Sequence, residues 1–149
     1  MKTFISIIFF ITAMSAGFLQ ADGDHQHLGH FDEKKLGKVN FPVSCTPIAQ
    51  EQFNQAVAML HSFWYDEAEK TFHQVTVIDP TCVMGYWGIA MSLYHQLWAT
   101  PPAAAELQKA REALLQTRKL VIKTKREKAY LEATESLYQD GEKADYGAR

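Results

Sequence analysis

Cysteine is scarce in this chain, with two residues, Cys45 and Cys82, among 149. The two form neither a CxxC nor a CxxCH motif, so the sequence gives no support for thioredoxin-like redox chemistry or haem attachment. Basic charge is not in surplus, because the formal net charge is −2, and this balance argues against a nucleic-acid partner. Hydrophobic residues make up 47% of the chain, which suits one modest domain with a packed core.

Long apolar runs are also missing, except in the first segment. MKTFISIIFFITAMSAGFLQA has one lysine, an apolar run over residues 4–14 and then small residues, which is typical of a bacterial secretory signal peptide. Its apolar part is too short to span a membrane comfortably. We expect residues 1–21 to be this signal, with cleavage after Ala21 and alternatives after Ala16 or Gly17. The mature chain would then be exported, periplasmic or secreted, and without a transmembrane segment.

The two cysteines are interpreted from this compartment. In an exported protein a cysteine pair is more often a disulfide than a metal or redox site. A Cys45–Cys82 bridge would close a loop of about 37 residues and stabilise the fold by about 4 kcal/mol on the chain-entropy account. The alternative is two separately buried thiols.

Residues 22–46 are predicted to form a flexible leader. The stretch is polar and punctuated by glycine, and it carries His25, His27 and His30 among several carboxylates. Imidazole and carboxylate groups suit Zn, Cu or Ni, but ordering a flexible segment costs entropy and no spacing here matches a closed site. Two interpretations therefore stand: a solvated leader, or a periplasmic metal-binding segment. Its end, VNFPVSC, is expected to be extended because Pro42 disfavours helix in the residue before it.

The remainder of the chain is rich in helix signals and has no convincing strand. Thr46 and Pro47 can start a first helix, Pro80 ends a second, and Thr81 can cap a third. The sequence TKRE at residues 124–127 has the spacing of a capping box and can open a last helix. The fold class is therefore all-α, built from antiparallel helix pairs. The predicted helices cover residues 47–61, 65–77, 82–95, 101–121 and 125–140, before a tail or truncated continuation over 141–149.

Residues 49–80 resemble a tetratricopeptide repeat, a helix-turn-helix unit of about 34 residues. Small side chains stand where the two helices of the repeat cross closely, and a large one stands one turn later. Gln52, Gln55 and Phe63 depart from the pattern, which prefers large apolar residues at the first two positions and glycine at the third. The matching residues are Ala56, Tyr65, Ala68, Phe72, Asp79 and Pro80.

A second unit begins with Tyr86, Ile89 and Ala90 at the corresponding positions, before residues 96–102 interrupt the period. The resemblance implies a helix-pair solenoid of about two and a half repeats over residues 47–140. A solenoid generally needs about three repeats and capping ends, so one helix is left unpaired. A homo-oligomer, a partner protein or missing C-terminal repeats would complete it.

A wider set of segments is similar to a poorly characterised group of exported bacterial tetratricopeptide-repeat proteins. The segments are FPVSC, LHSFWYDEAEKTF, DPTC, YWGIAMS and LW. This similarity spans residues 36–138, and members of the group are typically longer. It implies that the chain is a shortened member or a fragment.

In the tetratricopeptide family, side chains of the first helix of each repeat line a concave groove. Carried over to this sequence, the resemblance implies a groove rich in aromatic and methionine residues. Such a groove can hold an apolar peptide or a partner helix. The alternative is that a following helix, or the loop with Trp98, covers the same surface as part of the core. The implied groove residues are Phe53, Val57, Leu60, His61, Met84, Trp87, Met91, Tyr94 and His95.

No catalytic pattern accompanies these residues. His61, His73 and His95 have no serine elbow, no HExxH motif and no nucleophile–base pair around them. The sequence therefore predicts a non-catalytic protein-interaction module without a cofactor, which binds a protein or peptide partner in the groove. The alternative function is metal binding by the histidines of the leader.

Overall fold

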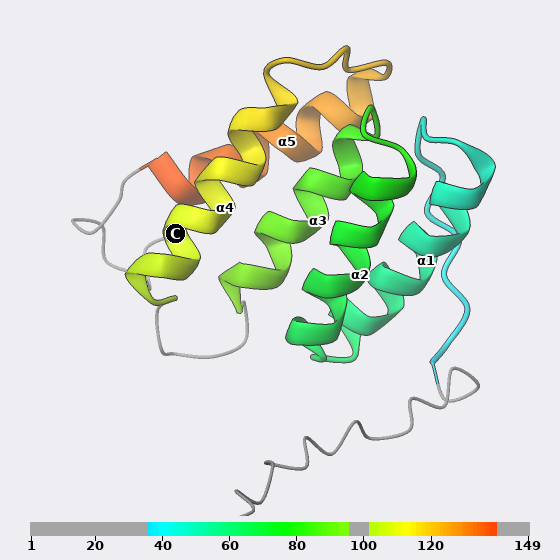
Figure 1. The fold of residues 1–149 in the computed structure, drawn as a ribbon, viewed down its shortest axis with the longest axis horizontal. Helices are drawn as coiled ribbons and strands as arrows, with labels where there is room; N and C mark the ends of the chain where they lie inside the picture. Colours follow the sequence, from blue (N-terminus) through cyan, green and yellow to red (C-terminus); the bar gives the residue numbers. More distant parts are fainter. Residues whose placement is uncertain (1–35, 96–101, 140–149) are drawn as a thin grey trace, which may run out of the picture. The chain divides into compact units, whose positions relative to one another are not determined.

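A computed structural model of the protein describes residues 36–95 and 102–139 (Figure 1). The predicted signal peptide, the leader before residue 36, the Trp98 loop and residues 140–149 lie outside this described part. The described residues contain no strand, so the predicted all-α class is confirmed. Their five helices are α1 (Pro47–His61), α2 (Tyr65–Ile78), α3 (Val83–Tyr94), α4 (Ala104–Thr117) and α5 (Lys125–Gln139).

Neighbouring helices pack against one another in pairs. Helix α1 packs on α2, α2 on α3 and α3 on α4, while α5 contacts both α3 and α4. Only residues 62–64 separate α1 from α2, so the chain must turn back at this point, and Figure 1 shows the two helices side by side. The packing of consecutive helices against each other therefore agrees with the sequence pattern.

The predicted bounds agree with the structure at α1 and differ most at α4. Helix α4 begins at Ala104 rather than at residue 101, and it ends at Thr117 rather than at residue 121. At its start, the carboxylate of Glu106 accepts a hydrogen bond from Ala103 N–H at 2.7 Å. Just after its end, the N–H groups of residues 119 and 120 bond to carbonyls three residues earlier, a tighter turn that ends the α-helical pattern.

The prediction that Thr81 caps the third helix is wrong. Helix α3 begins at Val83, with Cys82 at the cap position. The Thr81 hydroxyl instead donates to Asp79 Oδ1 at 2.7 Å, because this carboxylate is a close and charged acceptor. By contrast, the cap predicted at the start of α5 is confirmed, since Glu127 N–H donates to Thr124 Oγ1 at 3.1 Å.

The core lies where α1, α2 and α3 meet. Phe53 and Phe72 are fully buried, with their ring centroids 5.6 Å apart. The ring of Trp87 packs against both, at 6.2 and 6.3 Å. Glycine is required at position 88, because a Cβ on Gly88 would lie 2.1 Å from Phe72 Cδ1. Helices α2 and α3 therefore approach each other closely over the Phe72 ring.

Three consecutive residues before α1 are each fastened to a different part of the fold. Cys45 forms a disulfide with Cys82 at the start of α3, which confirms the predicted pair. Ser44 N–H donates to Glu127 Oε1 in α5 at 2.7 Å, and the Ser44 hydroxyl donates to the same carboxylate. We call the following three pairs the 44–46 clamp: Ser44–Glu127, Cys45–Cys82 and Thr46–Asp79.

Both carboxylates of the clamp are buried, Glu127 with 1% and Asp79 with 5% of its surface exposed. Burial opposes the charged form and alone would raise the pKa of Glu127, but hydrogen bonds from Ser44 and Thr124 outweigh burial, and the pKa is lowered. Burial likewise opposes ionisation of Asp79, yet hydrogen bonds from two threonines lower its pKa. The clamp is therefore strongest when both groups are charged.

The clamp predicts how stability depends on pH. Because both carboxyls have lower pKa values in the folded chain, their contribution is fully present above the ordinary values of 4.5 for Glu127 and 3.8 for Asp79. It is lost as the pH falls through the lower, folded-state values. We expect the free energy of unfolding, measured in urea, to fall between about pH 5 and pH 3, and to fall less steeply in Glu127→Gln.

Glu51→Gln, at an exposed position on α1, should keep the wild-type slope. Equal slopes for wild type and Glu127→Gln would contradict this role of the clamp.

The disulfide gives a second prediction. Removing it by Cys45→Ser and Cys82→Ser together should lower the free energy of unfolding by about 4 kcal/mol, since a 37-residue loop is released in the unfolded chain. Urea denaturation of the double variant and of the wild type under oxidising conditions gives the difference. A loss below about 1 kcal/mol would show that the hydrogen bonds of Ser44 and Thr46 hold the clamp without the covalent bond.

Candidate functional site

The predicted groove residues separate into three groups by their exposure. Met91 and His95 are partly exposed, and His61 is exposed at the end of α1. The other six are buried on α1 and α3. These buried residues are Phe53, Val57, Leu60, Met84, Trp87 and Tyr94.

Helix α5 covers one part of the surface that these residues form. The ring of Tyr138 lies 5.7 Å from that of Tyr94, and its hydroxyl donates to the Ala90 carbonyl at 2.6 Å. The Thr134 hydroxyl donates to Met91 Sδ at 3.4 Å. A following helix therefore occupies this part of the surface, which is the alternative that the sequence left open.

A second part of the surface holds Phe41, from the extended segment before α1. The Phe41 ring lies 5.5 Å from Phe53, 6.1 Å from Trp87 and 5.3 Å from Tyr130 of α5, measured between ring centroids. Arg126 Cζ lies 4.7 Å from the centroid of the same ring, within the range of a cation–π interaction. We call Phe53, Trp87, Tyr130 and Arg126 the Phe41 cluster. Phe41 itself is partly exposed, so its place is reached from the surface.

Polar side chains hold the main chain on both sides of Phe41. Asn54 Oδ1 accepts a hydrogen bond from Phe41 N–H at 3.2 Å, and Gln50 Nε2 donates to the Phe41 carbonyl at 3.0 Å. Gln50 Oε1 also accepts from Val43 N–H at 2.7 Å, and Arg126 donates to the carbonyl of the residue after Phe41. These contacts recognise main-chain groups that nearly all residues carry, so they can hold an extended segment of another sequence.

The sequence prediction included Phe53 and Trp87 but missed Phe41, Tyr130 and the polar side chains around them. The FPVSC motif was the available signal, because it places an aromatic residue before a proline that keeps the backbone extended. Its contact with α5 could not be inferred, since Phe41 and Tyr130 are distant in the sequence.

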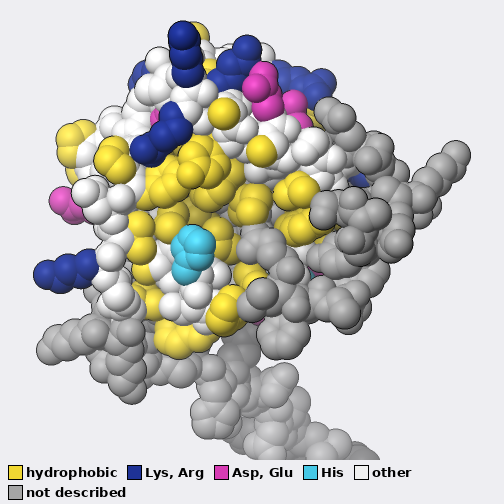
Figure 2. All heavy atoms as spheres, turned by 180° about the vertical axis from the view of Figure 1, so that it is seen from behind, with side chains coloured by type: hydrophobic (Ala, Val, Ile, Leu, Met, Phe, Trp, Pro, Cys, Tyr) yellow, Lys and Arg dark blue, Asp and Glu magenta, His cyan; other side chains and the backbone are white. Residues whose placement is uncertain are grey.

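Basic side chains border the clamp. Figure 2 shows hydrophobic side chains gathered on the face opposite to that of Figure 1, with lysine and arginine side chains along its upper edge. The connection from α4 to α5 lies at the top of Figure 1, and its Lys123 Nζ donates to the Ser44 carbonyl at 3.0 Å. One basic side chain therefore contacts the main chain of the clamp directly.

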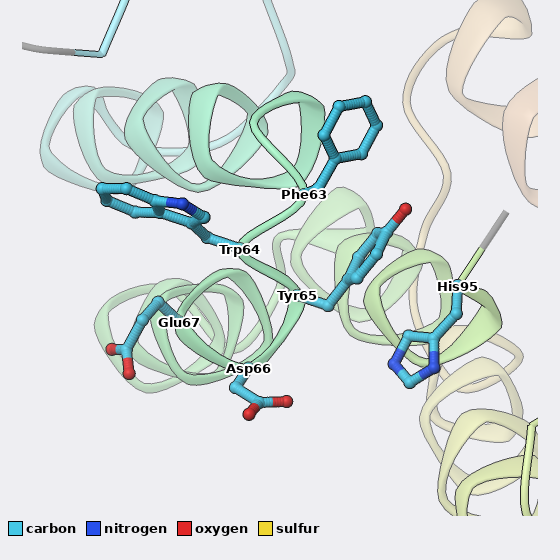
Figure 3. Close-up of a pocket in the computed structure, with 6 residues that line it drawn as sticks. All are labelled: Phe63, Trp64, Tyr65, Asp66, Glu67 and His95. Atoms are coloured by element: carbon cyan, nitrogen blue, oxygen red, sulfur yellow. The ribbon is translucent and has the colours of Figure 1, made fainter. Parts of the chain in front are cut away.

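A separate hollow of about 390 Å³ lies at the turn between α1 and α2. We call it the aromatic hollow, and Figure 3 shows its residues. The rings of Phe63 and Tyr65 lie 6.4 Å apart, and those of Tyr65 and His95 lie 4.9 Å apart. His95, a predicted groove residue, thus lies at this hollow beside Tyr65. The lining residues are Phe63, Trp64, Tyr65, Asp66, Glu67 and His95.

The backbone of the hollow is unusual. Phe63 has a φ of 62° and His95 a φ of 49°, and they are the only non-glycine residues with positive φ in the described part of the chain. Phe63 and Trp64 are nevertheless exposed, at 52% and 43%. A left-handed conformation costs a non-glycine residue about 1–2 kcal/mol, and glycine is the residue that the repeat pattern prefers at position 63. Packing of the Phe63 side chain thus does not explain why phenylalanine stands there.

The alternative metal ligands His25, His27 and His30 lie outside the described residues, so metal binding by the leader stays a prediction. Among residues 36–95 and 102–139, no group of three or more His, Cys, Asp and Glu side chains is arranged to hold a metal ion. No helix in this part of the chain has the length and apolar character needed to cross a membrane.

Comparisons with models of protein families, with curated proteins and with solved structures give no match to this chain.

The strained turn yields a prediction about stability. Replacing Phe63 by glycine should change the free energy of unfolding by no more than about 1 kcal/mol, because relief of the left-handed strain offsets the lost contact with Tyr65. Phe53→Ala, which empties a fully buried position, should cost about 3–5 kcal/mol in the same urea titration. A loss above about 2 kcal/mol in Phe63→Gly would assign Phe63 to the core instead.

Proposed function

We propose that this protein is an exported, non-catalytic interaction module of the tetratricopeptide type, which binds an extended segment of a partner protein on the Phe41 cluster. One observation carries the proposal. Side chains of α1, α3 and α5 already hold an extended segment of this chain through its main chain and one aromatic ring. A partner segment with an aromatic residue would present the same groups.

The packing of the helices supports a repeat of the tetratricopeptide type. Ala56 and Ala68, the small residues of the resemblance, are fully buried, and so is the large residue Phe72. Helices α1 and α2 pack together, α3 and α4 form a second pair, and α5 follows, which agrees with about two and a half repeats. The Cys45–Cys82 disulfide suits the oxidising compartment of an exported protein.

A partner segment has to compete with Phe41. Phe41 precedes the clamp, so its ring can leave the cluster while residues 44–46 stay fastened. Because it is attached to the same chain, Phe41 competes at an effective concentration on the order of millimolar. A partner therefore needs further contacts, and Trp87 Nε1–H is one group that can supply them, since it is buried without a hydrogen-bond partner among the described residues.

The proposal is tested with the chain's own sequence as the probe. The blocked peptide KVNFPVS, which copies residues 38–44, should bind the Phe41→Ala variant at least about tenfold more tightly than wild type, because the variant lacks the competing ring. Calorimetric titration gives both affinities, and circular dichroism checks that the variant is folded. The peptide KVNAPVS, without the aromatic side chain, should bind the variant about tenfold more weakly.

Two further variants in the Phe41→Ala background make the test specific. Gln50→Ala should weaken binding of KVNFPVS, since it removes the donor to the carbonyl of the aromatic residue. Ile48→Ala, at an exposed position on the same helix, should leave the affinity unchanged. If the folded Phe41→Ala variant does not bind KVNFPVS at millimolar concentration, or binds KVNAPVS equally well, the proposal is wrong.

A further inference from the structure

Three connections of the chain meet at the end of the helices that holds the 44–46 clamp, which we call the clamp end. The segment before α1 is fastened there to the start of α3 by the disulfide and to the start of α5 through Glu127. Lys123, in the connection from α4 to α5, donates to the same segment. Figure 1 shows these connections along the upper end of the helices. Side chains from three parts of the chain are therefore presented at one end of the fold.

Exposed aliphatic side chains gather at the clamp end. Each lies within two residues of Thr46, Asp79 or Lys123, which hold this end together. Val77 and Val121 are the most exposed, each with 78% of its surface accessible to solvent. Side chains this exposed contribute little to the core, and gathered apolar surface marks a binding site for a protein or a membrane. The aliphatic residues are Ile48, Val77, Ile78, Val121 and Ile122.

The same end carries a local excess of basic charge. Residues 118–126, which connect α4 to α5 and begin α5, have the sequence RKLVIKTKR and contain no acidic residue. Lys119, Lys123 and Lys125 are exposed, and none of the three takes part in an ion pair among the described residues. Positive charge and apolar side chains are therefore offered to solvent together.

The start of α5 departs from the local preference of a helix. Acidic side chains stabilise the first turn of a helix and basic ones oppose its dipole, yet Lys125 and Arg126 are the first two residues of α5. Arg126 has a structural role, because it lies over the Phe41 ring. Lys125 forms no ion pair and no side-chain hydrogen bond with another described residue. Its charge therefore favours a function at the surface rather than in the fold.

We propose that the clamp end binds the surface of an anionic phospholipid membrane. The lysines lie against lipid phosphate groups, and each cation near an anionic bilayer adds to the affinity. The aliphatic side chains enter the boundary between head groups and acyl chains, and no helix crosses the bilayer. A membrane is favoured over an acidic protein, because Val77 and Val121 extend from separate connections and a lipid interface accepts them without a matching pocket. The inference uses other residues than the Phe41 cluster and does not depend on the proposed function.

Binding to vesicles tests the proposal. The test uses the mature chain, because the apolar residues 1–21 would bind lipid themselves, and circular dichroism checks that this form is folded. Co-sedimentation should show at least about tenfold tighter binding to phosphatidylcholine vesicles with about 30% phosphatidylglycerol than to phosphatidylcholine alone. Raising salt from about 50 to about 300 mM should weaken this binding. Soluble poly-glutamate at equal charge concentration should bind at least about fivefold more weakly than the anionic vesicles, because it offers no apolar interior.

Matched variants test the basic contact. Lys119→Gln together with Lys125→Gln should weaken binding to the anionic vesicles about tenfold, since two cations near the lipid are removed. Lys70→Gln together with Lys109→Gln removes the same charge from exposed positions on α2 and α4. This control pair should change the affinity by less than about twofold, because charges farther from the lipid are screened by salt.

A second pair of variants tests the apolar contact. Val77→Ser together with Val121→Ser should weaken binding to the anionic vesicles about tenfold. Both positions are exposed, so Tm should stay close to that of wild type. Phe63→Gly, which removes an exposed ring at the other end of α1, should keep the wild-type affinity.

Four results would each overturn the proposal. The first is equal binding of the folded chain to the two kinds of vesicle, or binding to neither. The second is wild-type affinity in the Lys119 and Lys125 variant, and the third is wild-type affinity in the Val77 and Val121 variant. The fourth is binding to poly-glutamate as tight as to the anionic vesicles, which would assign the clamp end to an acidic partner in solution.

Discussion

The buried carboxylate of Glu127 is the constraint on which the position of α5 depends. A carboxylate with 1% exposure is tolerated only where donors surround it. The Ser44 N–H, the Ser44 hydroxyl and the Thr124 hydroxyl supply these donors, so the start of α5 must lie beside residue 44. Residue 45 is in turn bound to Cys82 at the start of α3. One charge and one covalent bond thus join segments up to 83 residues apart in the sequence.

The position of α5 determines which parts of the surface on α1 and α3 are covered. With Glu127 in place, Arg126 and Tyr130 of the same helix reach Phe41, and Tyr138 reaches Tyr94. Side chains that a repeat protein would offer to a partner are therefore packed within this chain. The Phe41 cluster stays accessible from the surface, because Phe41 is partly exposed. There the extended segment is held through its main chain and a single ring. The clamp makes this arrangement robust, because it fastens the chain directly after the segment that would have to move.

Local features could be predicted from the sequence, and contacts between distant residues could not. The bounds of α1 follow from neighbouring residues such as Pro47, and the disulfide was predicted from the expectation that the chain is exported. Helix α4 starts later than predicted because Glu106 accepts the Ala103 N–H and so caps the helix at residue 103. The prediction had placed the start at the proline of residue 101. Coverage by α5 depends on pairs such as Ala90 and Tyr138, 48 residues apart, for which the sequence carries no periodic signal. The left-handed backbone conformation of His95 could not be predicted from the sequence either. In this conformation the His95 ring lies beside that of Tyr65.

The buried polar groups of the fold differ in whether they have a hydrogen-bond partner. Glu127 is surrounded by donors, and Asp79 accepts from Thr46 and Thr81, so nothing in the clamp calls for a ligand. The Tyr65 hydroxyl lies in the same small fold without any partner among the described residues, next to a phenylalanine in a conformation that glycine adopts without strain. A sequence selected for stability alone would place glycine at position 63 and phenylalanine at 65. That it has neither is a departure from local preference at this turn, and such departures concentrate at functional sites.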